Sequence, residues 1–212
     1  MRFLTPLLIM VFISACATTY KPISNLGSIA NQSVETEELK MTVGLQDLGD
    51  NNRFRNRSNE ENISILKISV SNKIKSDVTV DAIELLNETK SSVYPTLTPR
   101  VTADRMKLNT WPYLIWGILW FGSTKCENGD CESTWIPVGL VIGLANLFIA
   151  RGTNSDFETE ITRTQFKPTV LKEKKSANGL VFLAGKGFTF HVKLSYHVGE
   201  SEKREMLVQY SI

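Results

Sequence analysis

The sequence FTFHVKLSYHV at residues 188–198, followed by MLVQYSI at residues 206–212, decides the fold class of this chain. In both stretches apolar residues alternate with polar ones, which is the period of a β-strand with one buried face. The residues between them, Gly199 to Glu202, are typical of a tight turn. The two stretches are therefore predicted to form an antiparallel β-hairpin.

Further stretches with strand character precede this hairpin. They lie at residues 39–45, 63–71, 78–86 and 180–184. In the third stretch the apolar alternation shifts phase between Ala82 and Ile83, which predicts a β-bulge. Gly49 to Glu61 is polar and is predicted to be a loop. Short strands at this spacing predict a mainly β protein folded as an antiparallel sandwich.

One part of this pattern resembles a known family. Residues 65–94 contain a strand ending in Ser71 and Asn72, a polar break, a second strand through Val80, and a short segment to Tyr94. This order resembles the immunoglobulin-like extracytoplasmic domains of uncharacterised bacterial lipoproteins. The resemblance implies an immunoglobulin-like β-sandwich whose relatives bind or support other envelope components, although a fold alone does not fix a function.

The first residues have the composition of an export signal. Arg2 precedes an apolar run, Pro6 to Ile13, which is too short to cross a bilayer as a helix of about 20 residues. The following Ser14-Ala15-Cys16 completes a stretch that resembles the lipobox of bacterial lipoproteins. That resemblance implies that residues 1–15 are a signal peptide and that Cys16 carries acyl chains such as palmitate. The alternative is an ordinary secretory signal that leaves Cys16 as a free thiol.

The same resemblance implies a location. In that family an Asp directly after the lipidated cysteine favours the inner membrane, and here Ala17 follows Cys16. We therefore expect the protein on the periplasmic face of the cell outer membrane, held by acyl chains. Residues 16–38 are rich in Ser, Thr, Asn and Gln and predict a flexible tether of about 25 Å reach. The folded domain is expected to occupy residues 39–212.

Residues 111–150 interrupt the β pattern with two apolar runs, at 111–122 and 135–150. As helices, these runs would be about 18 and 24 Å long, against a hydrocarbon thickness of about 30 Å. Neither length spans a bilayer comfortably. We expect an inserted apolar hairpin with helical arms that dips into one leaflet or packs on protein. A separate short helix is predicted at Ser155 to Gln165.

The apolar hairpin also contains the candidate contact residues. All four tryptophans of the chain lie in it, and Gly139 and Gly143 have GxxxG spacing in the second run. The predicted contacts with the membrane or a partner are Trp111, Trp116, Trp120, Trp135, Gly139 and Gly143. A buried aromatic cluster is the alternative for the tryptophans, and close packing within the protein is the alternative for the glycines.

Between the two runs lies Cys126-Glu127-Asn128-Gly129-Asp130-Cys131. Asn-Gly is the strongest two-residue hairpin signal, and a turn there sets Cys126 opposite Cys131. The same register sets Lys125 against Glu132 and Gly122 against Trp135. In an oxidising periplasm we expect a structural disulfide. A redox pair, a metal pair or free thiols are the alternatives. The odd count of three cysteines then divides into lipidated Cys16 and this bridge.

The sequence contains no pattern that predicts catalysis. The two histidines, His191 and His197, lie about 20 Å apart along one strand and cannot hold one metal ion together. No phosphate-binding loop, nucleophile elbow or zinc motif is present. We therefore expect no enzyme, no cofactor and no metal. With 24 basic and 22 acidic side chains, the net charge of +2 also argues against nucleic acid as a partner.

Together, these features predict a lipid-anchored cell-envelope protein that acts as a non-catalytic binding or assembly module. Its hairpin would contact the membrane or a protein partner. Two alternatives stay open. One is a structural lipoprotein that self-associates through the GxxxG run. The other is a carrier that holds a lipid or small ligand in an apolar pocket between the two runs.

Overall fold

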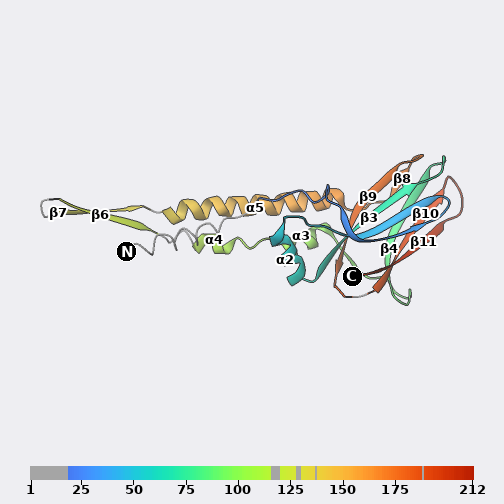
Figure 1. Cartoon of the computed structure of the whole chain (residues 1–212), viewed down its shortest axis with the longest axis horizontal. Coiled ribbons are helices and arrows are strands. Elements are labelled where there is room, and N and C mark those ends of the chain that lie inside the picture. The colour runs from blue at the N-terminus through green and yellow to red at the C-terminus, as the bar shows by residue number, and fades with distance from the viewer. Residues whose placement is uncertain (1–18, 116–119, 128–129, 137, 188) are drawn as a thin grey trace. The chain divides into compact units, whose positions relative to one another are not determined.

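The computed structural model describes residues 19–115, 120–127, 130–136, 138–187 and 189–212 (Figure 1). The chain forms two compact units. One combines Met1–Tyr20 with Leu108–Asp156, and the other combines Lys21–Lys107 with Phe157–Ile212. We call the second unit the two-sheet domain, and we call residues 111–150 of the first unit the apolar arm.

Two antiparallel β-sheets make up most of the two-sheet domain. One sheet has the strand order β1-β2-β3-β9-β5, and the other has the order β11-β10-β4-β8. The strands of the first are β1 (Ser28–Glu35), β2 (Leu39–Gln46), β3 (Ile63–Asn72), β5 (Thr96–Leu97) and β9 (Ser176–Ala184). Those of the second are β4 (Val78–Asn87), β8 (Thr169–Leu171), β10 (Thr189–Val198) and β11 (Arg204–Ser211). The prediction of a mainly β, antiparallel fold is confirmed.

One hydrophobic core contains residues of both sheets. In β10, the buried side chains of Phe190, Val192 and Leu194 alternate with the partly exposed His191 and Lys193. The first sheet contributes Leu39, Met41, Val43, Leu66, Ile68 and Val70 to the same cluster. Each large apolar side chain buried in this way stabilises the fold by about 1.5–3 kcal/mol.

The register of β10 reproduces two sequence-based predictions. β10 and β11 form the expected hairpin, and Phe188 lies outside the described residues. The predicted bulge lies in β4. Ser195 pairs with Ala82 and Tyr196 pairs with Val80, so Asp81 is the extra residue.

Part of the segment predicted to be a flexible tether is a strand. Residues 16–38 were expected to connect the lipid to the domain, but Ser28–Glu35 forms β1 at the edge of the first sheet. Its register shifts between Ile29 and Gln32, and most of its side chains are exposed. An edge strand of this kind is held by backbone hydrogen bonds more than by buried side chains. The sequence of β1 therefore lacks the alternation of apolar and polar residues that predicts a strand.

The predicted polar loop at Gly49 to Glu61 is also wrong over most of its length, because Asn52–Glu60 forms helix α2. Phe54 is buried and stacks on Phe157 at a centroid distance of 4.3 Å. Ser58, one turn further on, donates a hydrogen bond to the Ile63 carbonyl at 2.6 Å. Tertiary contacts on one face therefore stabilise a helix whose composition is polar.

One of the remaining helices precedes the apolar arm in the sequence, and the other two begin within it. α3 (Pro99–Met106) begins at a Thr98 cap that accepts a hydrogen bond from the Val101 N–H. α4 (Trp111–Ile115) follows, and α5 (Val138–Thr164) runs through both halves that were predicted as separate helices. No proline interrupts residues 138–164, and Gly152 lies within the helix. A single helix therefore replaces the two helices predicted at 135–150 and 155–165.

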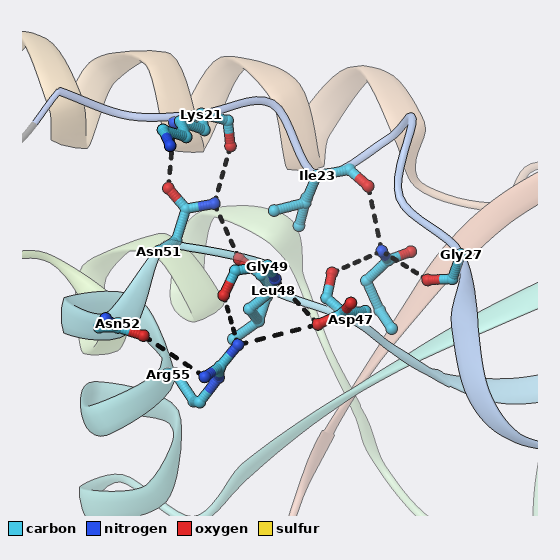
Figure 2. Close-up of polar contacts among 10 residues, drawn as sticks. Lys21, Ile23, Gly27, Asp47, Leu48, Gly49, Asn51, Asn52 and Arg55 are labelled. Atoms are coloured by element: carbon cyan, nitrogen blue, oxygen red, sulfur yellow. Dashed lines mark hydrogen bonds and ion pairs between the residues drawn. The ribbon is translucent and has the colours of Figure 1, made fainter.

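Residues 21–27 are fixed to the two-sheet domain by hydrogen bonds (Figure 2). The Lys21 N–H donates to Asn51 Oδ1 at 3.0 Å, and Asn51 Nδ2 donates to the Lys21 carbonyl at 2.8 Å. Gln46 Nε2 donates to the carbonyls of Ile23 and Gly27 at 3.0 and 3.3 Å. The chain is thus ordered well before residue 39, where the domain was expected to begin.

The carboxylate of Glu160 on α5 completes this attachment. It accepts hydrogen bonds from the N–H groups of Ile23, at 3.1 Å, and Ser24, at 2.6 Å. Both Glu160 and Ile23 are buried. Only residues 17–20 then separate Cys16, the predicted lipidation site, from Lys21, where the two-sheet domain begins. The chain from Cys16 to Lys21 can extend at most about 17 Å.

Candidate functional site: the apolar arm

A disulfide-closed β-hairpin lies in the middle of the arm. It consists of β6 (Phe121–Glu127) and β7 (Asp130–Ile136). The register sets Cys126 opposite Cys131, with Lys125 against Glu132 and Gly122 against Trp135, as predicted. The two cysteines form a disulfide with their Cα atoms 4.1 Å apart.

The strands extend one pair beyond the predicted pairing of Gly122 with Trp135, and they replace the expected helical ends of both apolar runs. β6 begins at Phe121 and β7 ends at Ile136, so the helical part of the first run in the described residues is the short α4. A Cβ added at Gly122 would lie 2.9 Å from the Trp135 ring. The glycine therefore leaves room for the tryptophan across the strand pair, and this contact favours strand pairing here.

Within the arm, α5 has two faces of opposite character. The buried positions follow the helical period and include two glycines, an asparagine and an alanine: Gly139, Gly143, Asn146, Leu147 and Ala150. The exposed positions carry large apolar side chains, 37% to 69% exposed: Leu140, Val141, Leu144, Phe148 and Ile149. We call these five exposed residues the outer face of α5. An ordinary surface helix of a globular protein has the reverse arrangement.

The buried face of α5 makes defined contacts inside the arm's own unit. Tyr113 of α4 forms a small buried cluster with Leu147 and Ala150. Further along α5, the side chain of Asn154 forms hydrogen bonds with both backbone groups of Leu108. Its Oδ1 accepts from the Leu108 N–H at 2.7 Å, and its Nδ2 donates to the Leu108 carbonyl at 3.1 Å. The orientation of the outer face is therefore set by packing on the opposite side of the helix.

The predicted contact residues divide between the two environments. Trp111, Trp120 and Trp135 are 57% to 67% exposed, which argues against a buried aromatic cluster. Trp116 and Cys16, the predicted lipidation site, lie outside the described residues. Gly139 and Gly143 are buried, which favours the alternative of close packing within the protein over an outward contact.

Sequence reasoning did not single out the outer face of α5. The signal was available in the helical period, because small or polar residues recur at 139, 143, 146 and 150 while large apolar residues occupy 140, 141, 144 and 148. The composition of the run hid this pattern, since nearly every residue in it is apolar.

The arm has no charged residue in either of its apolar stretches. Residues 111–124 and 133–150 contain no Asp, Glu, Lys or Arg, whereas the hairpin tip contains Lys125, Glu127, Asp130 and Glu132. Arg151 follows the second stretch. Within the part of the chain that the structure describes, no helix combines the length and the apolar character needed to cross a membrane.

Several polar pairs of the two-sheet domain join side chains on β10 to the strands on either side of it. His197 Nδ1 lies 3.1 Å from Asp81, the bulge residue. Lys193 lies 2.7 Å from Glu84 and 3.3 Å from Glu205, and the hydrogen bond to Glu84 raises the pKa of Lys193. These pairs connect β10 to β4 and β11. No group of residues that could hold a metal ion occurs among the described residues.

Comparisons with known proteins return only distant similarity. No protein-family model matches the chain, and no curated sequence matches it significantly. Among solved structures, the GAE domain of yeast GGA1 aligns at 9% identity and a TM-score of 0.35, covering 86% of this chain and 97% of that domain.

Two bacterial structures align at a similar level. A DUF4426 family protein of Pseudomonas aeruginosa has 8% identity and a TM-score of 0.32, with 86% of this chain and 94% of that one covered. The Bacillus subtilis protein ycdA, described as a candidate lipoprotein, has 11% identity and a TM-score of 0.36, with 84% of this chain and 38% of that one covered. Scores this low leave the function to be argued from this chain's own residues.

Proposed function

We propose that this chain is a lipid-anchored cell-envelope protein that acts as a non-catalytic binding or assembly module. In this proposal the two-sheet domain is an immunoglobulin-like scaffold, and the apolar arm is the contact surface. The observation that carries the proposal is the outer face of α5, which exposes five large apolar side chains on one side of a helix. An exposed apolar patch of this kind marks an interaction site.

The anchoring part of the proposal is supported by the sequence around Cys16 and by the chain that follows it. The lipobox-like Ser14-Ala15-Cys16 predicts acylation, and the disulfide of the arm fits an oxidising compartment. The outer membrane, on its periplasmic face, is the proposed location. Because the domain begins at Lys21, the lipid would hold this first residue of the scaffold within about 17 Å of the membrane surface.

The experiment for anchoring is the Cys16→Ser variant in cells. We expect the wild-type protein to fractionate with the outer membrane and the variant to lose its covalent lipid, which mass spectrometry of the N-terminal peptide measures directly. An unmodified Cys16 in the wild-type protein would overturn the lipid anchor.

The experiment for binding is photocrosslinking in intact cells from position 148 of the arm. Val170 on β8 is a matched control, because it is an apolar side chain of similar exposure, 55%, in the two-sheet domain. We expect adducts from position 148 and few or none from position 170. Equal labelling from both positions, or none from position 148, would contradict the assignment of the arm as the contact surface.

A further inference from the structure

We infer that the partner of the arm is lipid, and that the outer face of α5 lies in one leaflet of a bilayer. This inference rests on the proposed function, because it names the occupant of the same surface. Its first support is the inverted arrangement of α5. Helices that contact lipid place small and polar residues toward their protein neighbours and large apolar residues outward. Asn146 is buried and Phe148 is exposed, in agreement with that rule.

The second support is the chemistry of the outer face, which contains no side chain that can form a hydrogen bond. Its five residues are all aliphatic or phenyl. Protein–protein interfaces form about one hydrogen bond per 100–200 Å² and are not much more apolar than other surfaces. Hydrocarbon requires no hydrogen bonds at all. A lipid leaflet therefore matches this face better than another protein does.

The third support concerns depth. The uncharged part of α5, residues 138–150, is about 20 Å long, less than the hydrocarbon thickness of about 30 Å. The charged Arg151 follows this part of the helix. The β6–β7 sheet has only two strands, so the outer backbone N–H and C=O groups of both strands need hydrogen bonds from water or lipid headgroups. These features place the arm in the interface of one leaflet, where the exposed Trp111, Trp120 and Trp135 also fit.

Vesicle binding tests the inference with the mature chain carrying Cys16→Ser, so that acyl chains do not mask the arm. The vesicles contain phosphatidylethanolamine and phosphatidylglycerol. All four tryptophans lie at 111–135, so intrinsic fluorescence reports on the arm. We expect a blue shift on adding vesicles, and stronger quenching by bromines near the headgroups than by bromines at the ends of the acyl chains.

The matched variants are Val141→Asp with Phe148→Asp in the arm, and Val170→Asp in the two-sheet domain. We expect the arm variant to bind vesicles more than tenfold more weakly and the control to bind like the parent chain. Circular dichroism of the variants verifies that each is folded. Val141, Phe148 and the control residue Val170 are all exposed, so their substitution leaves the core intact.

Three results would overturn the inference. One is no blue shift and no vesicle binding by the parent chain, and another is equal loss of binding in both variants. The third is an arm-dependent dimer in sedimentation that forms without lipid and does not bind vesicles. A protein adduct from position 148 in cells, combined with no vesicle binding, would reject lipid but keep the proposed binding module. If position 148 gives no adduct in cells and the parent chain does not bind vesicles, the lipid inference and the proposed binding module are both rejected.

Discussion

The two-sheet domain and the apolar arm use the same kind of side chain in opposite ways. In β10, Phe190, Val192 and Leu194 face the core and are fully buried, whereas Phe148 of α5 is 65% exposed. In the domain, apolar side chains supply the free energy of folding. In the α5 part of the arm, the buried positions hold mostly small residues and an asparagine, with Leu147 as the one large apolar side chain among the five named above. This difference is the basis of our proposal that the arm contacts something outside the chain.

The largest expected effect contrasts one phenylalanine from each region. Phe190→Ala removes a buried ring and should lower the free energy of unfolding by about 3–5 kcal/mol. Phe148→Ala removes a mostly exposed ring and should change it by less than about 0.5 kcal/mol. Urea denaturation of both variants, followed by circular dichroism, measures the difference. Equal destabilisation by the two substitutions would show that the outer face of α5 is covered by the chain itself.

The second effect concerns the attachment of residues 21–27. Glu160→Ala leaves the N–H groups of Ile23 and Ser24 without their acceptor and should cost about 3 kcal/mol. Hydrogen exchange at these two amides should accelerate most. Glu158→Ala is the control, because Glu158 is an exposed carboxylate on the same helix. Similar exchange rates in both variants would show that the Glu160 carboxylate does not hold the segment.

The strands with clear alternation could be predicted from the sequence, and the others could not. β10 and β11 have one buried and one exposed face, so their side chains report the strand directly. β1 and the short β5 depend on backbone pairing with β2 and β9, which leaves little trace in side-chain type. Alternation therefore reveals strands that bury one face in the core, including the edge strand β11, and misses edge strands such as β1 that bury few side chains.

The site divides in the same way between local and tertiary signals. The disulfide register could be predicted because the Asn128-Gly129 sequence fixes the pairing of its neighbours. The division of α5 into a buried and an exposed face depends on contacts such as that of Tyr113 with Leu147, and these come from a distant segment. Glu160 was missed for the same reason. Its partners lie more than 130 residues away in the sequence.

Reduction of the disulfide should have a smaller and more local effect. Closing the short loop between Cys126 and Cys131 should stabilise the hairpin by about 2 kcal/mol in the loop-entropy estimate. The two-sheet domain is a separate compact unit, so its urea midpoint should not change. Hydrogen exchange with and without reductant, compared between β6–β7 and β3, distinguishes the two regions. A lower urea midpoint of the two-sheet domain after reduction would contradict this independence.

The smallest expected effect is a dependence of stability on pH that is confined to the two-sheet domain. Hydrogen bonds and charge from Lys73 and Lys21 lower the pKa of Glu35 and Asp50 below their usual values of 4.5 and 3.8. A carboxylate whose pKa is lowered in the folded protein stabilises the fold at pH values above its usual pKa. This stabilisation is lost as the pH falls through the lowered pKa. For Lys193, whose pKa is raised above 10.5, the contribution is lost as the pH rises through the raised value.

The Glu35 and Asp50 carboxylates are exposed at the surface, so the urea midpoint should fall only slightly on acidification below about pH 4.5, and less so at high salt. Asp50→Asn should remove the part that depends on Lys21. The outer face of α5 contains no ionisable side chain, so its contribution to vesicle binding should not change over the same pH range. A rise in the urea midpoint on acidification would contradict the assigned ion pairs. Vesicle binding that tracks the titration of these carboxylates would indicate that charge, not the apolar face of the arm, mediates the contact.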